Sequence, residues 1–348
     1  MSSSLLSGVS QADLLRRVGS IEQVGGATRL RFAEGPARDM EMVQVETGAG
    51  LAFQILPDRG MGIGRATLCG VPLCWVSAVG DVAPWFYEPS GAAWLRTFGG
   101  GLLTSCGLTN LGAETRVDGI EVGLHGRLSH LPARNVSVSR DWVNGVHHVA
   151  VSGTVLDYCV MGPALEVKRT YSVTLGENVI HIHDEITNRG ARPEPLFLLY
   201  HFNFGYPLFS ETAELSIPSS IGVEARNPAY ADEVADWRRF SAPTPGALER
   251  VFFHRLAAEQ ETAVIRLENT VGSHRLTMRM EFPTQAMTHL VQWKMMAERE
   301  YVLGLEPGTC FVSGRDDTLQ RGDVKTLAAG ATKVVDVAVA FALEPSMS

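Results

Sequence analysis

The stretch of sequence that decides the fold runs from position 198 to 207 and reads Leu198-Leu199-Tyr200-His201-Phe202-Asn203-Phe204-Gly205-Tyr206-Pro207. Its apolar and aromatic residues, followed by Gly-Tyr-Pro, predict a buried β-strand that ends at a turn. His201 and Asn203 are two positions apart, so a strand directs both side chains to the same face. Burying an imidazole or an amide is costly unless it has a polar partner. This face is therefore either a satisfied part of the core or a functional site.

Short strands with Gly and Pro between them account for most of the remaining chain, and no repeat of fixed period interrupts them. Only the beginning is helical, because Ser10 is placed as an N-cap for a short helix that starts with Gln11-Ala12-Asp13-Leu14-Leu15 and stops near Gly19-Ser20. We therefore expect a helical extension over 1–24 and a single domain over 25–348. Many short strands and few helices predict an all-β fold, either a sandwich or a barrel. The predicted strands include 29–32, 40–47, 51–56, 136–139, 147–155, 165–173, 179–186, 211–217, 251–253, 262–268, 274–282, 301–307 and 334–343.

Composition excludes several classes of function. A net charge of −8 without a Lys/Arg cluster argues against a nucleic-acid partner. The apolar runs are too short to cross a membrane, and the first six residues lack the features of a signal peptide. Five scattered cysteines form no C-x-x-C pair, which disfavours a disulfide framework or a structural zinc site. These features favour a cytoplasmic protein.

Two other stretches place ionisable residues in apolar surroundings. Gly123-Leu124-His125-Gly126-Arg127 holds a histidine, and Leu303-Gly304-Leu305-Glu306-Pro307-Gly308 holds a carboxylate. With His201, these residues make a plausible acid/base set. The segment Pro57–Gly64 carries Arg59, which is either part of a tight turn or an arginine presented to an anionic or hydroxylated ligand.

Cofactor and metal motifs are weak. The three glycines at 99–101 lack the Lys-Ser/Thr and the strand–helix context of a nucleotide loop. His181 and His183 share one face of a predicted strand, but no third metal ligand lies nearby in the sequence. We therefore predict neither a cofactor nor a metal, while a metal-dependent isomerase using these two histidines or His125 remains an alternative.

Five motifs in this order resemble the aldose 1-epimerase (galactose mutarotase-like) superfamily, and most closely its branch of unknown function. They are Pro57-Asp-Arg-Gly-Met61, Leu124-His-Gly-Arg127, Tyr200-His-Phe-Asn-Phe-Gly-Tyr-Pro207, Gln292-Trp-Lys-Met-Met296 and Gly304-Leu-Glu-Pro-Gly308. The resemblance extends over about residues 25–343. It implies a large twisted β-sandwich, called a supersandwich, with a sugar in a cleft on the concave sheet.

The resemblance also implies roles for individual residues. His201 matches the general acid toward the ring oxygen, Glu306 the base that removes the anomeric proton, and His125 the histidine that binds and polarises the sugar. The arginine that holds the sugar is Arg59, Arg96 or Arg127. The sugar-gripping aspartate of well-known mutarotases has no match, and Gly62 stands where this branch suggests an acidic residue.

Ring opening removes a proton from the C1 hydroxyl and delivers another to the ring oxygen, so one base and one acid suffice. We expect a raised pKa for Glu306 in its apolar setting and a protonated His201. From residue type, Trp293 could stack on a sugar face while Asn203 and Lys294 bond hydroxyls. The prediction is an aldose 1-epimerase-like isomerase, either a monomer or a homodimer, that acts on a neutral or acidic sugar. A non-catalytic carbohydrate-binding protein and another sugar epimerase or isomerase on this fold are the alternatives.

Overall fold

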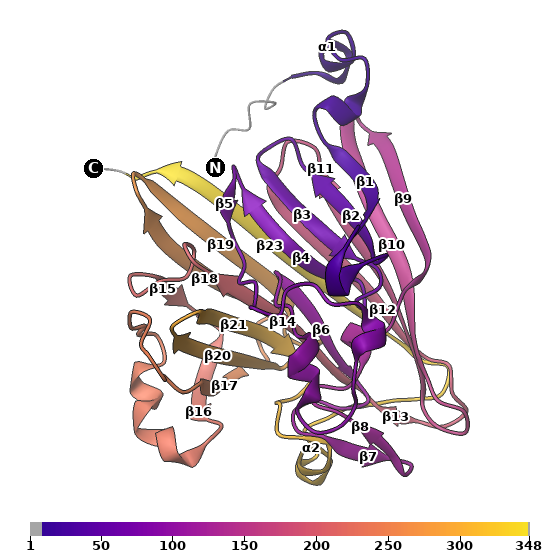
Figure 1. Cartoon of the computed structure of the whole chain (residues 1–348), viewed down its shortest axis with the longest axis vertical. Helices are drawn as coiled ribbons and strands as arrows, with labels where there is room; N and C mark the ends of the chain where they lie inside the picture. The colour runs from indigo at the N-terminus through magenta and orange to yellow at the C-terminus, as the bar shows by residue number, and fades with distance from the viewer. Residues whose placement is uncertain (1–8, 347–348) are drawn as a thin grey trace.

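The computed structural model describes residues 9–346 and has two large antiparallel sheets packed face to face (Figure 1). The eleven-stranded sheet has the order β1 (Gly26–Arg31), β2 (Glu41–Glu46), β3 (Leu51–Leu56), β4 (Gly62–Leu68), β6 (Leu103–Leu108), β14 (Phe197–Gly205), β21 (Glu300–Gly308), β20 (His289–Ala297), β17 (Arg250–Leu256) and β16 (Ser220–Ala225), with β5 (Val71–Pro72) beside β4. The eight-stranded sheet has the order β15 (Glu214–Ser216), β18 (Thr262–Val271), β19 (His274–Pro283), β23 (Thr332–Pro345), β12 (Val179–Asn188), β11 (Ala164–Thr174), β10 (Val146–Tyr158) and β9 (Arg134–Val143).

The smaller elements connect these sheets or lie at their ends. Two short pairs are β7 (Thr115–Val117) with β8 (Ile120–Val122) and β13 (Glu194–Pro195) with β22 (Thr326–Leu327). The α-helices are α1 (Gln11–Leu15) and α2 (Arg315–Arg321). The 3₁₀ helices are η1 (Ile21–Gln23), η2 (Gly35–Ala37), η3 (Pro84–Phe86), η4 (Ala93–Thr97), η5 (Leu128–His130) and η6 (Pro228–Asp236). No helix in the described range 9–346 is long and apolar enough to span a membrane.

Burial follows the pattern that a two-layer sandwich requires. Along β10, buried and less buried residues alternate, because one face packs on the other sheet while the opposite face meets solvent. The central strand β14 differs, since all nine of its residues are buried. Tyr200, Phe202 and Phe204 point into the core between the sheets. Phe197 and Leu199, four and two positions before His201, instead join a second apolar cluster on the other face.

The predicted β-sandwich is confirmed, and so is the short N-terminal helix. Ser10 caps α1 by accepting a hydrogen bond from the Asp13 backbone N–H at 3.1 Å. One local interpretation was incomplete: the segment over 57–64, which was interpreted as a tight turn or a ligand-binding loop, already enters β4 at Gly62. The first six residues, predicted not to be a signal peptide, lie outside the described part.

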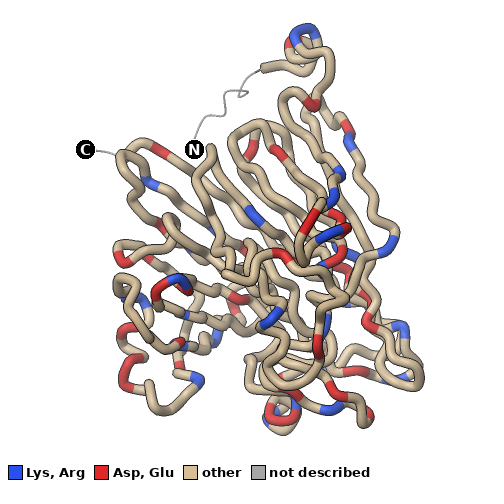
Figure 2. Tube along the Cα trace, viewed as in Figure 1, with Lys and Arg blue, Asp and Glu red and all other residues tan. Residues whose placement is uncertain are grey.

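Charged residues are interspersed along most of the trace rather than gathered in one block (Figure 2). Many of them pair across strands, as Lys168 does with Glu185 at 2.8 Å and Arg189 with Glu166 at 2.7 Å. Such exposed pairs contribute little to stability, about 0–1 kcal/mol each. These exposed pairs therefore do not mark a functional site.

Candidate active site

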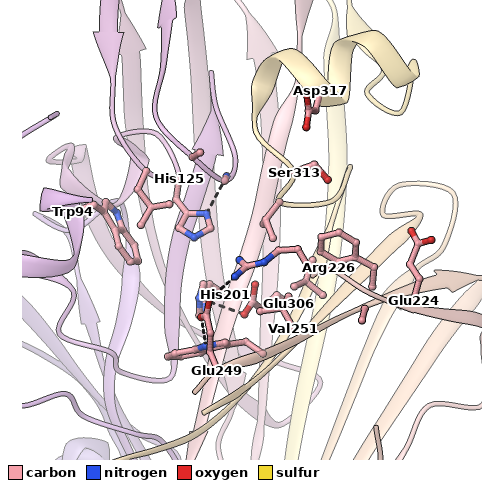
Figure 3. A pocket seen from close by; sticks show the side chains of 18 of the residues that line it. Trp94, His125, His201, Glu224, Arg226, Glu249, Val251, Glu306, Ser313 and Asp317 are labelled. Atoms are coloured by element: carbon pink, nitrogen blue, oxygen red, sulfur yellow. Dashed lines mark hydrogen bonds and ion pairs between the residues drawn. The ribbon is translucent and has the colours of Figure 1, made fainter. Parts of the chain in front are cut away.

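A cavity of about 690 Å³ lies over the second face of β14, and residues from β16, β17, β20 and β21 and from the loops around His125 and α2 line it (Figure 3). His125, His201 and Glu306 all line this cavity. The structure thus brings together three side chains that are separated by 76 to 181 positions in the sequence, by subtraction of their numbers. The volume of the cavity is within the range of about 300–1,000 Å³ that is typical of small-molecule sites.

Strand register explains why His201 meets Glu306. Strands β14 and β21 are antiparallel, with Leu199 opposite Gly308 and Phe202 opposite Leu305, so His201 lies opposite Glu306. The imidazole Nε2 is 3.3 Å from the carboxyl Oε1. A Cβ at Gly304 would lie 2.4 Å from this same oxygen, so the glycine makes room for the Glu306 side chain.

Burial sets the protonation of this pair. Only 5% of His201 and 2% of Glu306 is exposed, and Glu306 Oε1 accepts no hydrogen bond from the described residues. Burial lowers the pKa of His201 to about 4 and raises the pKa of Glu306 well above its usual range. The expected direction for Glu306 is confirmed. The expectation of a protonated His201 is not met, because desolvation favours the neutral imidazole.

His125 is held in one tautomer by its loop. The backbone N–H of Gly112 donates to its Nδ1 at 3.4 Å, so the proton of the neutral ring is on Nε2. Burial lowers the pKa of His125 to about 3, which keeps the ring neutral. Its ring centroid is 6.0 Å from that of His201 and 5.2 Å from that of Trp94. A neutral imidazole with an Nε2–H can donate a hydrogen bond to a ligand oxygen.

The loop around His125 depends on glycine. His125 itself has a φ of +58°, and Gly126 follows with a φ of +71°. A Cβ on Gly126 would lie 2.6 Å from the carbonyl oxygen of Gly107 in β6. Because Gly126 has no side chain, the Leu-His-Gly turn can approach the sheet closely enough to place the His125 imidazole in the cavity.

The sequence analysis missed five charged residues of the cavity, which are Glu224, Arg226, Glu249, Asp317 and Arg321, and two of these form a pair beside the reacting groups. Arg226, just after β16, forms an ion pair with Glu249, just before β17, and Trp293 Nε1 donates to the other Glu249 oxygen at 3.0 Å. In Figure 3 the Arg226 guanidinium points toward His201 and Glu306. Neither Arg226 nor Glu249 belongs to a motif. Each is next to the end of a strand, where a charged side chain is usually exposed to solvent. Only the spatial pairing of β16 with β17 reveals them.

The three predicted sugar-holding arginines do not line the cavity. Arg59 is 8% exposed and donates to the carbonyl oxygens of Ser129, Val82 and Thr97, so it fastens three connections together. Arg96 is exposed and lies 3.7 Å from Glu88. Arg127 pairs with Asp157 at 2.7 Å and faces a different pocket.

Trp293, expected to stack on a sugar face, lines the cavity, but Asn203 and Lys294, expected to bond hydroxyls, do not. Asn203 shares the face of His201 as predicted, but its amide donates to the carbonyl oxygens of Gly101 and His201 and is fully buried. Lys294 points to the opposite side of β20 and donates to the carbonyl oxygens of Asp236 and Arg239. The alternation of β20 explains the difference between these neighbours, since adjacent side chains point to opposite faces.

The alternative metal ligands lie elsewhere. His181 and His183 are on the solvent-facing side of β12, and His183 Nδ1 is 2.7 Å from the carboxylate of Asp336 on β23. Among the described residues, no group of three or more His, Cys, Asp or Glu side chains is arranged to hold a metal ion. These two histidines are thus separated from the cavity by the eight-stranded sheet to which they belong.

Solved structures share this fold. A candidate aldose 1-epimerase from Klebsiella pneumoniae subsp. pneumoniae MGH 78578 superposes with a TM-score of 0.84 at 23% identity, over 98% of this chain and 90% of the other. A galactose mutarotase-like protein from Clostridium acetobutylicum gives 0.64 at 13% identity, over 93% and 100%. The galactose 1-epimerase of Lactobacillus acidophilus NCFM gives 0.56 at 14% identity, over 92% and 99%. No curated protein matches the chain.

The fold is thus that of the galactose mutarotase-like β-sandwiches, as the five motifs predicted. The profile of the family described as "Domain of unknown function (DUF4432)" matches residues 37–341. The chain belongs to this family, which is the branch of unknown function that the sequence resembles.

Proposed function

We propose that the protein is an aldose 1-epimerase-like isomerase that interconverts the anomers of a sugar by opening and reclosing its ring. The observation that carries this proposal is the approach of His201 Nε2 to Glu306 Oε1, at 3.3 Å, on the floor of a sugar-sized cavity. Acid/base ring opening needs two such groups on one substrate. It needs no cofactor, nucleotide or metal.

In the proposed reaction, Glu306 accepts the proton of the C1 hydroxyl and His201 delivers a proton to the ring oxygen. Burial favours neutral imidazole with carboxylic acid, whereas this reaction starts from imidazolium with carboxylate. The two forms differ only in which group holds the single proton. A bound sugar would stabilise the charged form, because its hydroxyls donate to Glu306 Oε1, which lacks a hydrogen bond in the described structure.

Other residues of the cavity suit a sugar. The rings of Trp94, Phe98 and Trp293 surround the two histidines, with Phe98 at 5.4 Å and Trp293 at 5.6 Å from the His201 ring. Aromatic faces pack against the C–H faces of sugars, and the His125 Nε2–H supplies a hydrogen bond to an oxygen. Arg226 takes the place that we expected for Arg59, Arg96 or Arg127, because its guanidinium faces the cavity.

The test is anomer exchange measured by saturation-transfer NMR on a panel of neutral, acidic and deoxy sugars. We expect faster exchange for at least one sugar, and Glu306→Gln should lower it by about 10²-fold or more. The matched control is Glu300→Gln, since Glu300 is exposed on the same strand β21 and should leave the rate unchanged. Exchange that survives Glu306→Gln unchanged would show that Glu306 is not the base.

The same panel separates the alternatives. Sugar binding without any exchange would identify a carbohydrate-binding protein. Conversion at a carbon other than C1 would identify a different epimerase or isomerase. We further propose that residues 25–348 act as one sugar-binding domain and that the protein is cytoplasmic. All five cysteines are free thiols, which suits a reducing compartment.

A further inference from the structure

Arg226 and Glu249 form a pair that lines the cavity, but neither residue is one of the proposed reacting groups, His201 and Glu306. Arg226 Nη2 donates a hydrogen bond to Glu249 Oε1, and Trp293 Nε1 donates one to Glu249 Oε2 at 3.0 Å. Trp293 in turn packs its indole edge-on against His201, with ring centroids 5.6 Å apart. Glu249 therefore fixes the guanidinium of Arg226 and the indole of Trp293 beside His201 and Glu306. Figure 3 labels Arg226, Glu249, His201 and Glu306.

We propose that Arg226 and Glu249 form a charge pair that tunes the proton affinity of Glu306, with Arg226 favouring the carboxylate and Glu249 limiting that effect. This inference deepens the proposed function and rests on it for its catalytic meaning. The effect on the proton affinity of Glu306 does not depend on a substrate. Arg226 and Glu249 act as positioning and tuning residues, and Glu306 is the group that reacts.

The charges that face Glu306 come from each element packed around it. His201 on β14 is its closest ionisable neighbour, and His125 and Cys106 are buried and uncharged, since burial lowers the pKa of the imidazole and raises that of the thiol. On the other side stand Arg226, just after β16, and Glu249, just before β17, while β20 contributes the neutral Trp293. The cavity wall also holds Glu224 of β16 and Asp317 and Arg321 of α2. Of these charged residues, Arg226 and Glu249 are the two that act on the Glu306 carboxyl.

These two charges act on Glu306 in opposite directions. After burial, which raises the pKa of Glu306 most, Arg226 lowers it and Glu249 raises it. Arg226 also lowers the pKa of His125. The side chains of Arg226 and Glu249 are 40% and 47% exposed, so water and salt weaken their field without abolishing it.

The experiment is a pH titration of the Glu306 carboxyl carbon by NMR, on full-length protein labelled with ¹³C at glutamate side-chain carboxyls. The Glu306 signal is the one missing from Glu306→Gln. Arg226→Gln should move its midpoint up by about half a unit or more, and Glu249→Gln should move it down, because an unpaired arginine then acts on the carboxyl. Arg226→Lys keeps the charge and should move the midpoint less than Arg226→Gln.

Two controls make the result specific. Arg96→Gln removes an arginine outside the cavity and should leave the midpoint unchanged, and thermal unfolding verifies that each variant folds. Higher salt should shrink the shifts. Equal midpoints, shifts of the same sign in Arg226→Gln and Glu249→Gln, or a carboxyl that does not titrate between pH 4 and 10 in any variant would each overturn the proposal. Because the titration needs no substrate, its failure is distinct from an absence of anomer exchange.

Discussion

Glu306 is an energetically costly residue for a folded protein. Its carboxyl is buried with no hydrogen bond to Oε1 in the described structure, and burial raises its pKa well above the usual range. In the unfolded chain this carboxyl has the ordinary glutamate pKa of 4.5. Above that pH the unfolded state loses its proton first, so the native state becomes less stable as the pH rises toward the folded pKa.

Replacing Glu306 should therefore stabilise the protein in a pH-dependent way. We expect Glu306→Gln to gain at least ~1 kcal/mol relative to wild type between pH 5 and pH 8, since glutamine cannot ionise. Urea unfolding at both pH values measures the gain. The exposed Glu300→Gln should show no such dependence, and a stability difference for Glu306→Gln that is the same at pH 5 and pH 8 would contradict the argument.

The cavity residues differ in how visible they are in the sequence. His125, His201 and Glu306 stand in apolar stretches where an ionisable group is unusual, and all three were predicted to meet. Arg226 and Glu249 could not be predicted, because charges beside strand ends are ordinary and their importance depends on which strands pair. Asn203 shows the opposite error: its face was predicted correctly, but its amide is consumed by backbone carbonyls.

At the scale of elements, strands with strong apolar alternation were predicted well and connections were not. The predicted strand over 51–56 coincides with β3, whereas the 57–64 segment was interpreted as one loop although β4 begins within it. Glycine-rich segments give weak periodicity, so a strand that contains Gly62 and Gly64 is hidden. The same uncertainty misplaced Arg59, since a turn residue can face either solvent or the interior.

Arg59 should be essential to the connections rather than to sugar binding. Its guanidinium donates to three carbonyl oxygens, from the segment before η3, from η4 and from η5, and it is buried. Removing it would leave those acceptors without donors, so Arg59→Ala should cost about 3 kcal/mol or more in unfolding free energy. Chemical denaturation measures this cost. The exposed Arg96→Ala should cost less than ~0.5 kcal/mol, and equal costs for the two variants would refute the assignment.

At the scale of the whole molecule, the sandwich buries several histidines in neutral form. Burial lowers the pKa of His125 to about 3, of His130 to about 2, and of His201 and His254 to about 4. Their ordinary value is 6.5. His125 and His201 line the cavity, His130 contacts Arg59, and His254 of β17 contacts Gln292 of β20, so the effect is spread over the fold.

These histidines should make the protein sensitive to acid. Between pH 6.5 and about 4 the unfolded chain binds protons that the native state refuses, so stability falls as the pH falls. Four carboxyls with raised pKa values oppose this trend, but the six histidines with lowered pKa values outnumber them. The carboxyls are those of Asp58, Asp81, Asp157 and Glu306, and the histidines are the four named above together with His147 and His289. We expect the melting temperature to drop markedly across this window, as measured by calorimetry in buffers of constant ionic strength.

A single buried histidine outside the cavity tests the cause. His254 is fully buried, with Ser220 Oγ 3.0 Å from its Nδ1 and Gln292 Oε1 3.1 Å from its Nε2. His254→Gln removes one proton-binding site of the unfolded chain, so stability should depend less steeply on pH, by up to ~1.4 kcal/mol per pH unit. A lower stability of this variant at pH 7 does not affect the test, since the test compares only how steeply stability changes with pH. His274→Gln, at an exposed position of β19, is the control. If both variants keep the wild-type slope, the acid sensitivity arises from other groups.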